Sequence, residues 1–263
     1  MHQKSLSVFR DISFNPNHIE EYIPMQALHT MVFDRFCEDG WCYWADLIFR
    51  RNYWEWRGQP CRVVLLRIRL KDFTFSKSQR KCLRRNDDLS VSRRAIQIST
   101  AHEALFERHA VRFAHNRPMS IYGFFSFFSS IMPCFGVQFD VYKQKKLLAT
   151  SFFHIGKRSM AGNYCIHEPA EAQRSLGTFT MLKEIEFAIE TGREFYYPGF
   201  VYDLPSEFDY KLNFNNLEYF DWRTGSWQAR ERMPVRKWTN LVEAWEDPGQ
   251  APGIAQSGMQ CDC

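Results

Sequence analysis

The stretch "RSLGTFTMLKEIEFAIETGREFYYPGF", from Arg174 to Phe200, is the most informative part of the sequence for the fold. Its first part predicts a helix ending at Gly192, because apolar residues recur at helical spacing and glycine commonly ends a helix. The aromatic run from Glu194 to Phe200 predicts a strand directly after it. A helix followed at once by a strand indicates a layered fold in which helices pack on a sheet.

Strand patterns surround this unit on both sides. In "RVVLLRIRL", Arg62 to Leu70, the last apolar residues alternate with arginines, which is the periodicity of a half-buried strand. The stretch from Phe135 to Ile155 predicts two strands joined by a polar turn around residues 144–146. Further strands are expected at residues 39–60, 163–167 and 217–227. The pattern predicts an α+β fold, with mixed α/β character.

Two other segments have helix signals at their starts. Ser76 and Gln79 form a capping-box pattern before a helix that we expect to reach about Asn86. Thr100 and Glu103 form a second such pattern, and the helix that follows would extend to His115.

Composition limits the kinds of protein that this chain can be. Its 263 residues are 45% hydrophobic and carry a formal net charge of +4, so a sizeable core is expected and disorder is not. No apolar run approaches the roughly 20 residues of a membrane helix. The first residues have no continuous apolar region of a secretory signal. We therefore expect a cytoplasmic protein that does not associate with membranes.

The eight cysteines do not form the paired clusters of a structural zinc site. Cys37 and Cys42 are loosely spaced, and Cys261 and Cys263 are too close together. The other four are scattered. We expect thiols rather than ligands, and therefore no bound metal.

A basic segment, "FTFSKSQRKCLRRNDDL", runs from Phe73 to Leu89. Its cations lie three or four residues apart, so several can share one face of a helix. Such a local patch suits a phosphate-bearing partner, although a solvated helix face without a partner is the alternative. The candidate contacts with nucleic acid are Lys77, Arg80, Lys81, Arg84 and Arg85.

Several separated motifs together resemble one family. The basic segment is similar to a Phe-x-x-Ser-Lys/Arg-Ser signature followed by Arg-Asn-x-Asp-Leu. "ALFERHAVRFAH" is similar to a helix of the same family, and "RSLGTF…EFYYPGF" to its Ser-Leu-Gly helix and Tyr-Leu-Gly-Tyr strand. "FDYKLNF" is similar to its Met-x-Tyr-Lys motif. The family is that of the arginyl- and leucyl-tRNA–protein transferases, and the resemblance extends from Arg62 to Trp227.

The resemblance implies a GNAT-like acyltransferase core, aminoacyl-tRNA as co-substrate and a protein or peptide amine as acceptor. Arginine or leucine would be transferred, and no cofactor would be needed. The sequence departs from the family pattern at three places. Only Cys61 remains of the cysteine cluster before the first core strand, Pro198 replaces leucine, and Phe208 replaces methionine.

Candidate catalytic residues follow from this resemblance and from the chemistry of ester aminolysis. Backbone N–H groups between Ser175 and Thr178 could stabilise an oxyanion, because helix N-termini attract negative charge. Gly177 would let the ester approach closely. Tyr197, Tyr210 and Lys211 could orient the ester or relay a proton, although Tyr197 also fits a core position and Ser175 a helix cap.

We expect three parts in a monomeric chain: an aromatic-rich N-terminal subdomain (residues 1–61), the transferase core (62–235) and a largely disordered tail (236–263). Two other functions remain open. A GNAT enzyme using acyl-coenzyme A would need a second small residue where Phe179 stands, and we expect the bulky ring to obstruct a pyrophosphate. A non-catalytic RNA-binding module would keep only the basic helix.

Overall fold

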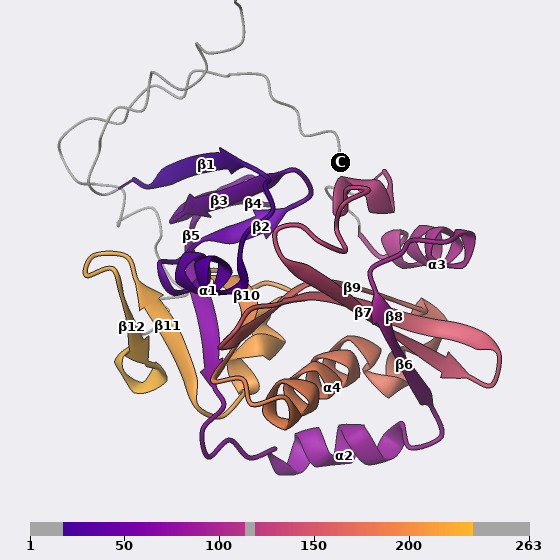
Figure 1. Cartoon of the computed structure of the whole chain (residues 1–263). Coiled ribbons are helices and arrows are strands. Elements are labelled where there is room, and N and C mark those ends of the chain that lie inside the picture. The colour runs from indigo at the N-terminus through magenta and orange to yellow at the C-terminus, as the bar shows by residue number, and fades with distance from the viewer. Residues whose placement is uncertain (1–17, 114–118, 234–263) are drawn as a thin grey trace, which may run out of the picture.

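The computed structural model describes residues 18–113 and 119–233. Within them, nine strands form one large sheet in the order β12-β11-β5-β10-β9-β8-β7-β6, with β4 paired to β5. A separate three-stranded sheet has the order β1-β3-β2. Figure 1 shows α4 and α2 side by side along one face of the large sheet. The small sheet and α1 lie near β10 and β12 of the large sheet. The predicted α+β fold class is confirmed.

The helices are α1 (Thr30–Glu38), α2 (Lys77–Arg85), α3 (Thr100–Ala110) and α4 (Leu176–Glu190), and the 3-10 segments are η1 (Ile121–Gly123), η2 (Pro169–Arg174), η3 (Asp209–Asn213) and η4 (Arg230–Arg232). The small sheet and β4 comprise β1 (Glu20–Pro24), β2 (Cys42–Trp44), β3 (Leu47–Arg51) and β4 (Tyr53–Trp56). The remaining strands are β5 (Gln59–Arg69), β6 (Ser90–Ala95), β7 (Phe135–Lys143), β8 (Lys146–Ile155), β9 (Ser159–His167), β10 (Phe195–Tyr202), β11 (Leu217–Asp221) and β12 (Ser226–Ala229).

Helices cover both faces of the large sheet. Neighbouring side chains on a strand point to opposite faces, and β8 shows this clearly. Phe152 packs in a cluster with Leu105 and Phe106 of α3, whereas Phe153 packs in a cluster with Leu182 of α4. The end of β9 therefore lies between a helix on each side.

The local predictions are largely confirmed. The Ser76 hydroxyl accepts a hydrogen bond from the Gln79 backbone N–H at 3.3 Å, and Gln79 Oε1 accepts one from the Ser76 backbone N–H at 2.8 Å. The β7–β8 hairpin turns at residues 144–145. The prediction for α3 was wrong by one residue at its start and by several at its end. Ser99 is the N-cap, the His102 side chain accepts from its backbone N–H at 3.1 Å, and the helix ends at Ala110.

The predicted boundary between residues 61 and 62 falls inside β5. Several hydrogen bonds join the parts on either side of it; for example, the Tyr43 hydroxyl donates to the Ala161 carbonyl at 2.9 Å, and the Trp227 indole donates to the Glu38 carbonyl at 2.8 Å. The three-part division stays a prediction. The tail at residues 236–263, with Cys261 and Cys263, and the expected helix end at His115 lie outside the described residues.

Candidate active site

The strands β9 and β10 run parallel but pair over only three residues each, Ser159–Ala161 with Phe195–Tyr197. Both strands are then irregular. The register of β9 against β8 shifts between Gly162 and Tyr164, and that of β10 against β5 shifts between Tyr196 and Gly199. Pro198 lies in this second irregularity, where a residue without an N–H group is tolerated because no ladder hydrogen bond is required.

A buried carboxyl group lies near the place where β9 and β10 stop pairing. Glu184 of α4 is 3% exposed and accepts a hydrogen bond of 2.7 Å from the Tyr196 hydroxyl. A Cβ atom placed at Gly162 would lie 2.8 Å from that hydroxyl and 3.3 Å from Glu184 Oε2. Glycine is therefore needed at this position for the pair to fit. Burial raises the pKa of Glu184 to about 7, and the bond from Tyr196 opposes that rise in part.

The end of β9 brings three other elements together. His167 is its last residue, and a Cβ at Gly177 of α4 would lie 3.8 Å from His167 Cδ2. Arg112, just after α3, makes a short contact from Nη1 to His167 Nε2 and lies 3.5 Å from His109 Nδ1. Burial lowers the pKa of His109 to about 3 and that of His167 to about 4, and the charge of Arg112 lowers both further. Both rings are neutral at physiological pH.

Tyr210 of η3 completes this group. Burial raises the pKa of its hydroxyl well above the ordinary value, Cys165 and Glu184 raise it further, and Arg112 opposes them. The residue as a whole is 37% exposed, so part of the ring is at the surface. We refer to Gly177, His167, Arg112, Tyr210 and Glu184 together as the β9 cluster.

The first residues of α4 differ from a simple capped helix. Ser175 is exposed and has left-handed backbone angles (φ 54°, ψ 49°), and its side chain makes no capping bond. Ser175 is the N-cap residue of α4, as the helix-cap alternative expected, but its side chain supplies no capping hydrogen bond. The first N–H groups of a helix have no partner within the helix, so those at residues 176–178 are oriented to bind a negatively charged oxygen.

Two predicted catalytic residues lie outside the β9 cluster. Tyr197 packs in a buried cluster with Phe33 and Cys37 of α1, at 8% exposure. Lys211 donates to the Phe200 carbonyl at 3.2 Å, and its Nζ lies 5.0 Å from the ring centre of Phe208. Burial lowers the pKa of Lys211 to about 8. The ammonium group of Lys211 is therefore not an ordinary surface charge.

The five predicted RNA-binding cations are all exposed on α2. At about 100° per residue they lie within an arc of about 140°, opposite the buried side chains of Gln79, Cys82 and Asn86. Arg80 donates to the Phe75 carbonyl and Arg85 to the Gln173 carbonyl, both in short contacts. The side chains of Lys77, Lys81 and Arg84 have no acidic partner among the described residues.

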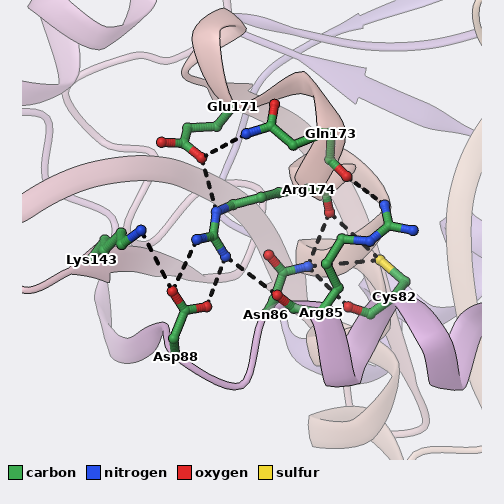
Figure 2. Close-up of polar contacts among 8 residues, drawn as sticks. All are labelled: Cys82, Arg85, Asn86, Asp88, Lys143, Glu171, Gln173 and Arg174. Atoms are coloured by element: carbon green, nitrogen blue, oxygen red, sulfur yellow. Dashed lines mark hydrogen bonds and ion pairs between the residues drawn. The ribbon is translucent and has the colours of Figure 1, made fainter.

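The basic helix is fastened to the segment that leads into α4 (Figure 2). The Asn86 side chain donates to the Arg174 carbonyl at 3.0 Å, and Arg174 donates to Asp88 at 2.7 and 2.9 Å. Arg174 also contacts Glu171 at 2.9 Å. These bonds set the exposed cations of α2 beside the N-terminus of α4, so two predicted parts of the site are adjacent.

Three members of the β9 cluster were missed in the sequence: Glu184, Arg112 and His167. A signal existed for Glu184, because it follows Leu176 and Thr180 at helical spacing and so falls on the buried stripe of its helix. Arg112 and His167 are far apart in the sequence, and no local pattern indicates that they meet.

Other candidate groups have structural roles. His102 is buried and lies 2.9 Å from Asp140, which also accepts from Gln138 and Thr150 at 2.9 Å. In the part of the chain that the structure describes, no three His, Cys, Asp or Glu residues are placed to hold a metal ion. None of the helices described there is long and apolar enough to cross a membrane.

Comparisons with known proteins point to one family. The family model described as "Arginine-tRNA-protein transferase, C terminus" matches residues 101–221. An aspartate/glutamate leucyltransferase of Chromohalobacter salexigens is 30% identical over 229 residues, covering 81% of this chain and 92% of the relative. The enzyme of the same name from Hahella chejuensis is 26% identical over 215 residues, covering 77% and 91%.

Solved structures share the fold more loosely. The L-PGS structure from Bacillus licheniformis has a TM-score of 0.42 at 8% identity, covering 71% of this chain and 53% of that chain. A GCN5-related N-acetyltransferase from Kribbella flavida has a TM-score of 0.31 at 10% identity, covering 53% and 48%. Likeness at this level does not bear on function, and the GNAT-like description of the core rests on family membership. The extent and identity of the leucyltransferase matches show that the chain belongs to the aminoacyl-tRNA–protein transferase family and is an enzyme of that class.

Proposed function

We propose that this enzyme transfers leucine from leucyl-tRNA to the N-terminal amine of a protein that begins with Asp or Glu. The names of the similar enzymes support this choice of amino acid and acceptor. The structural observation that carries the proposal is the attachment of the basic helix α2 to the N-terminus of α4, through Asn86, Asp88 and Arg174. It sets an RNA-binding face next to a group of N–H donors.

In this arrangement the acceptor stem lies along α2. Lys77, Lys81 and Arg84 contact its phosphates, since duplex RNA is recognised mainly by shape and backbone. The aminoacylated 3′ end then extends past Arg174 toward Gly177. The small size of Gly177 matters because a Cβ there would already be in van der Waals contact with His167, and a larger side chain would occupy the space beside it.

The chemistry is aminolysis of an activated ester. The nitrogen lone pair of the neutral α-amine attacks the ester carbonyl, and the N–H groups at residues 176–178 stabilise the oxyanion. The tetrahedral intermediate then expels the ribose oxygen, so that a C–N bond forms and a C–O bond breaks. The amine loses one proton and the ribose oxygen gains one. Glu184, with a pKa of about 7, is suited to hold this proton between the two steps.

Arginine is the alternative donor, because the matching family model carries an arginine description. Use of acyl-coenzyme A is a third possibility. The expected obstruction by Phe179 was wrong, because this ring is 4% exposed and packs inward with the core on α4. Phe179 therefore does not distinguish tRNA from coenzyme A, and the preference for tRNA rests on α2 and on the family.

The test is transfer of labelled amino acid to a peptide with N-terminal Asp, from leucyl-tRNA, arginyl-tRNA and acyl-coenzyme A in parallel. We expect transfer from leucyl-tRNA. Gly177→Val should reduce it roughly 100-fold by misplacing the ester, while Gly177→Ala, which adds only one atom in ordinary contact, should retain it. Transfer of arginine alone, or of the acyl group alone, would refute the proposal. A folded, fully active Gly177→Val protein would remove the start of α4 from the site.

A further inference from the structure

Arg112 occupies an unusual position at the end of β9. It is exposed, and its Nη1 contacts Nε2 of His167. Most arginines near it have an acidic partner: Arg108, one turn earlier, pairs with Glu168 at 2.9 Å, and Arg94 pairs with Asp140 at 2.8 Å. Arg112 has no acidic partner within residues 18–113 and 119–233. Its positive charge is therefore uncompensated there.

The histidines that Arg112 contacts, His109 and His167, are neutral and largely buried. A guanidinium can only donate, so Nε2 of His167 is the acceptor and the ring proton is on Nδ1. That Nδ1 is buried and has no hydrogen-bond partner, and the same is true of the Tyr164 hydroxyl. Arg112 is near enough to Tyr164 to lower the pKa of its hydroxyl. Buried polar groups are rarely left without partners, so a cation in contact with a ring that carries one of them points to an absent anionic ligand.

This position is close to the expected reaction centre. Gly177 is next to His167, and Nε2 of that ring contacts Arg112. In an N-terminal Asp or Glu, the side-chain carboxylate is separated from the α-amine by only a few bonds. A carboxylate held at Arg112 would therefore place that amine beside the N–H groups at the start of α4.

We propose that Arg112 binds the side-chain carboxylate of the acceptor's first residue and so sets a preference for Asp and Glu. This rests on the proposed function, in which the acceptor is an acidic N-terminus. The planar guanidinium matches a carboxylate in a two-bond geometry. Phosphate contacts are assigned instead to α2, whose cations are exposed and together form a surface long enough to follow an RNA backbone.

The experiment compares matched peptides that begin with Asp or Asn, with leucyl-tRNA as donor. We expect Arg112→Gln to lower kcat/KM for the Asp peptide roughly 10- to 100-fold, the range of a lost charged hydrogen bond. It should leave the Asn peptide and the Kd for leucyl-tRNA nearly unchanged, so the Asp/Asn ratio falls toward one. Arg112→Lys, which keeps the charge but loses the fork, should give an intermediate ratio. Arg108→Gln is the control on the same helix and should keep the wild-type ratio.

Two outcomes would overturn the inference: an unchanged Asp/Asn ratio in Arg112→Gln, or an equal loss with both peptides together with weaker tRNA binding. The second would assign the guanidinium to RNA. Calorimetric binding of the two peptides without tRNA gives a separate readout. If wild-type protein transfers no leucine, the proposed function fails. The Arg112 inference still stands in that case if wild-type protein binds the Asp peptide more tightly than the Asn peptide and Arg112→Gln does not. If the two proteins show the same preference in binding, the inference fails as well.

Discussion

Glu184 is a carboxyl group at 3% exposure, placed on the buried stripe of α4 and bonded to the Tyr196 hydroxyl. Its raised pKa means that the folded protein holds a proton which the unfolded chain, with a pKa near 4.5, releases at lower pH. The stabilising effect of this protonation is complete below about pH 4.5 and is lost as the pH rises through about 7.

Replacing Glu184 with Gln should remove this dependence, because the amide is neutral at every pH and can still accept from Tyr196. Relative to wild type, the free energy of unfolding of Glu184→Gln should gain about 3 kcal/mol between pH 4.5 and pH 8. Chemical denaturation at several pH values measures this. Glu186→Gln on the same helix, whose carboxylate pairs with Lys183, should show no such gain. Parallel pH curves for wild type and Glu184→Gln would contradict the assignment.

Residue-level roles in the site were predictable only in part. The capping pair Ser76 and Gln79 and the basic arc of α2 follow from local spacing and were confirmed. Tyr197 was named from the family's Tyr-Leu-Gly-Tyr strand, and such a motif does not show that the side chain packs against α1. Arg112 and His167 meet only because α3 and β9 end at the same place, which depends on tertiary packing and has no local signal.

At the scale of elements, α2 is an exposed basic helix with one buried side and firm attachments to η2. Its attachments use backbone carbonyls and the side chains of Asn86, Asp88 and Arg174. The cations at Lys77, Lys81 and Arg84 contribute to none of these bonds. Charge on α2 can therefore be removed without loosening the helix from α4.

Replacing Lys77, Lys81 and Arg84 together with Gln should weaken binding of every tRNA by a similar factor. The slope of log affinity against log salt should flatten by about two to three, since roughly 0.7 to 0.9 counterions are released per phosphate contact. Filter binding across a salt series, with a thermal melt beside it, measures both effects. The control variant removes three exposed cations elsewhere, Arg57, Lys157 and Arg223, and has the same net charge. An equal change of slope in both variants would mean that α2 has no special part in RNA binding.

At the scale of the whole molecule, the small sheet is held to the large one through α1. Asp34 of α1 accepts from the Ser159 hydroxyl at 2.6 Å, from its N–H at 3.1 Å and from the Arg158 N–H at 2.9 Å, at the start of β9. A Cβ at Gly156 would lie only 2.0 Å from Asp34 Oδ1, so this turn leaves no room for another side chain. The strand that carries His167 therefore begins at an attachment to the N-terminal part.

Asp34→Ala should lower the free energy of unfolding by about 2 to 4 kcal/mol, because three hydrogen bonds to a charged group are lost and two backbone N–H groups lose their acceptor. Denaturant unfolding measures this. Asp39→Ala, at the C-terminal end of the same helix, is the matched control: its carboxylate forms an exposed pair with Arg35 at 2.9 Å, and the substitution should change stability by less than about 1 kcal/mol. Equal effects of the two substitutions would show that Asp34 does not attach α1 to β9.

The position of β5 in the large sheet has a consequence for how the chain is made. This strand lies between β10 and β11, and Ile68 pairs with Leu217. During synthesis, the apolar face of β5 leaves the ribosome long before either neighbour exists. Contacts so distant in sequence slow folding, and an unpaired strand edge is prone to aggregation meanwhile. The nascent chain should thus depend on chaperones until its last strands have been translated.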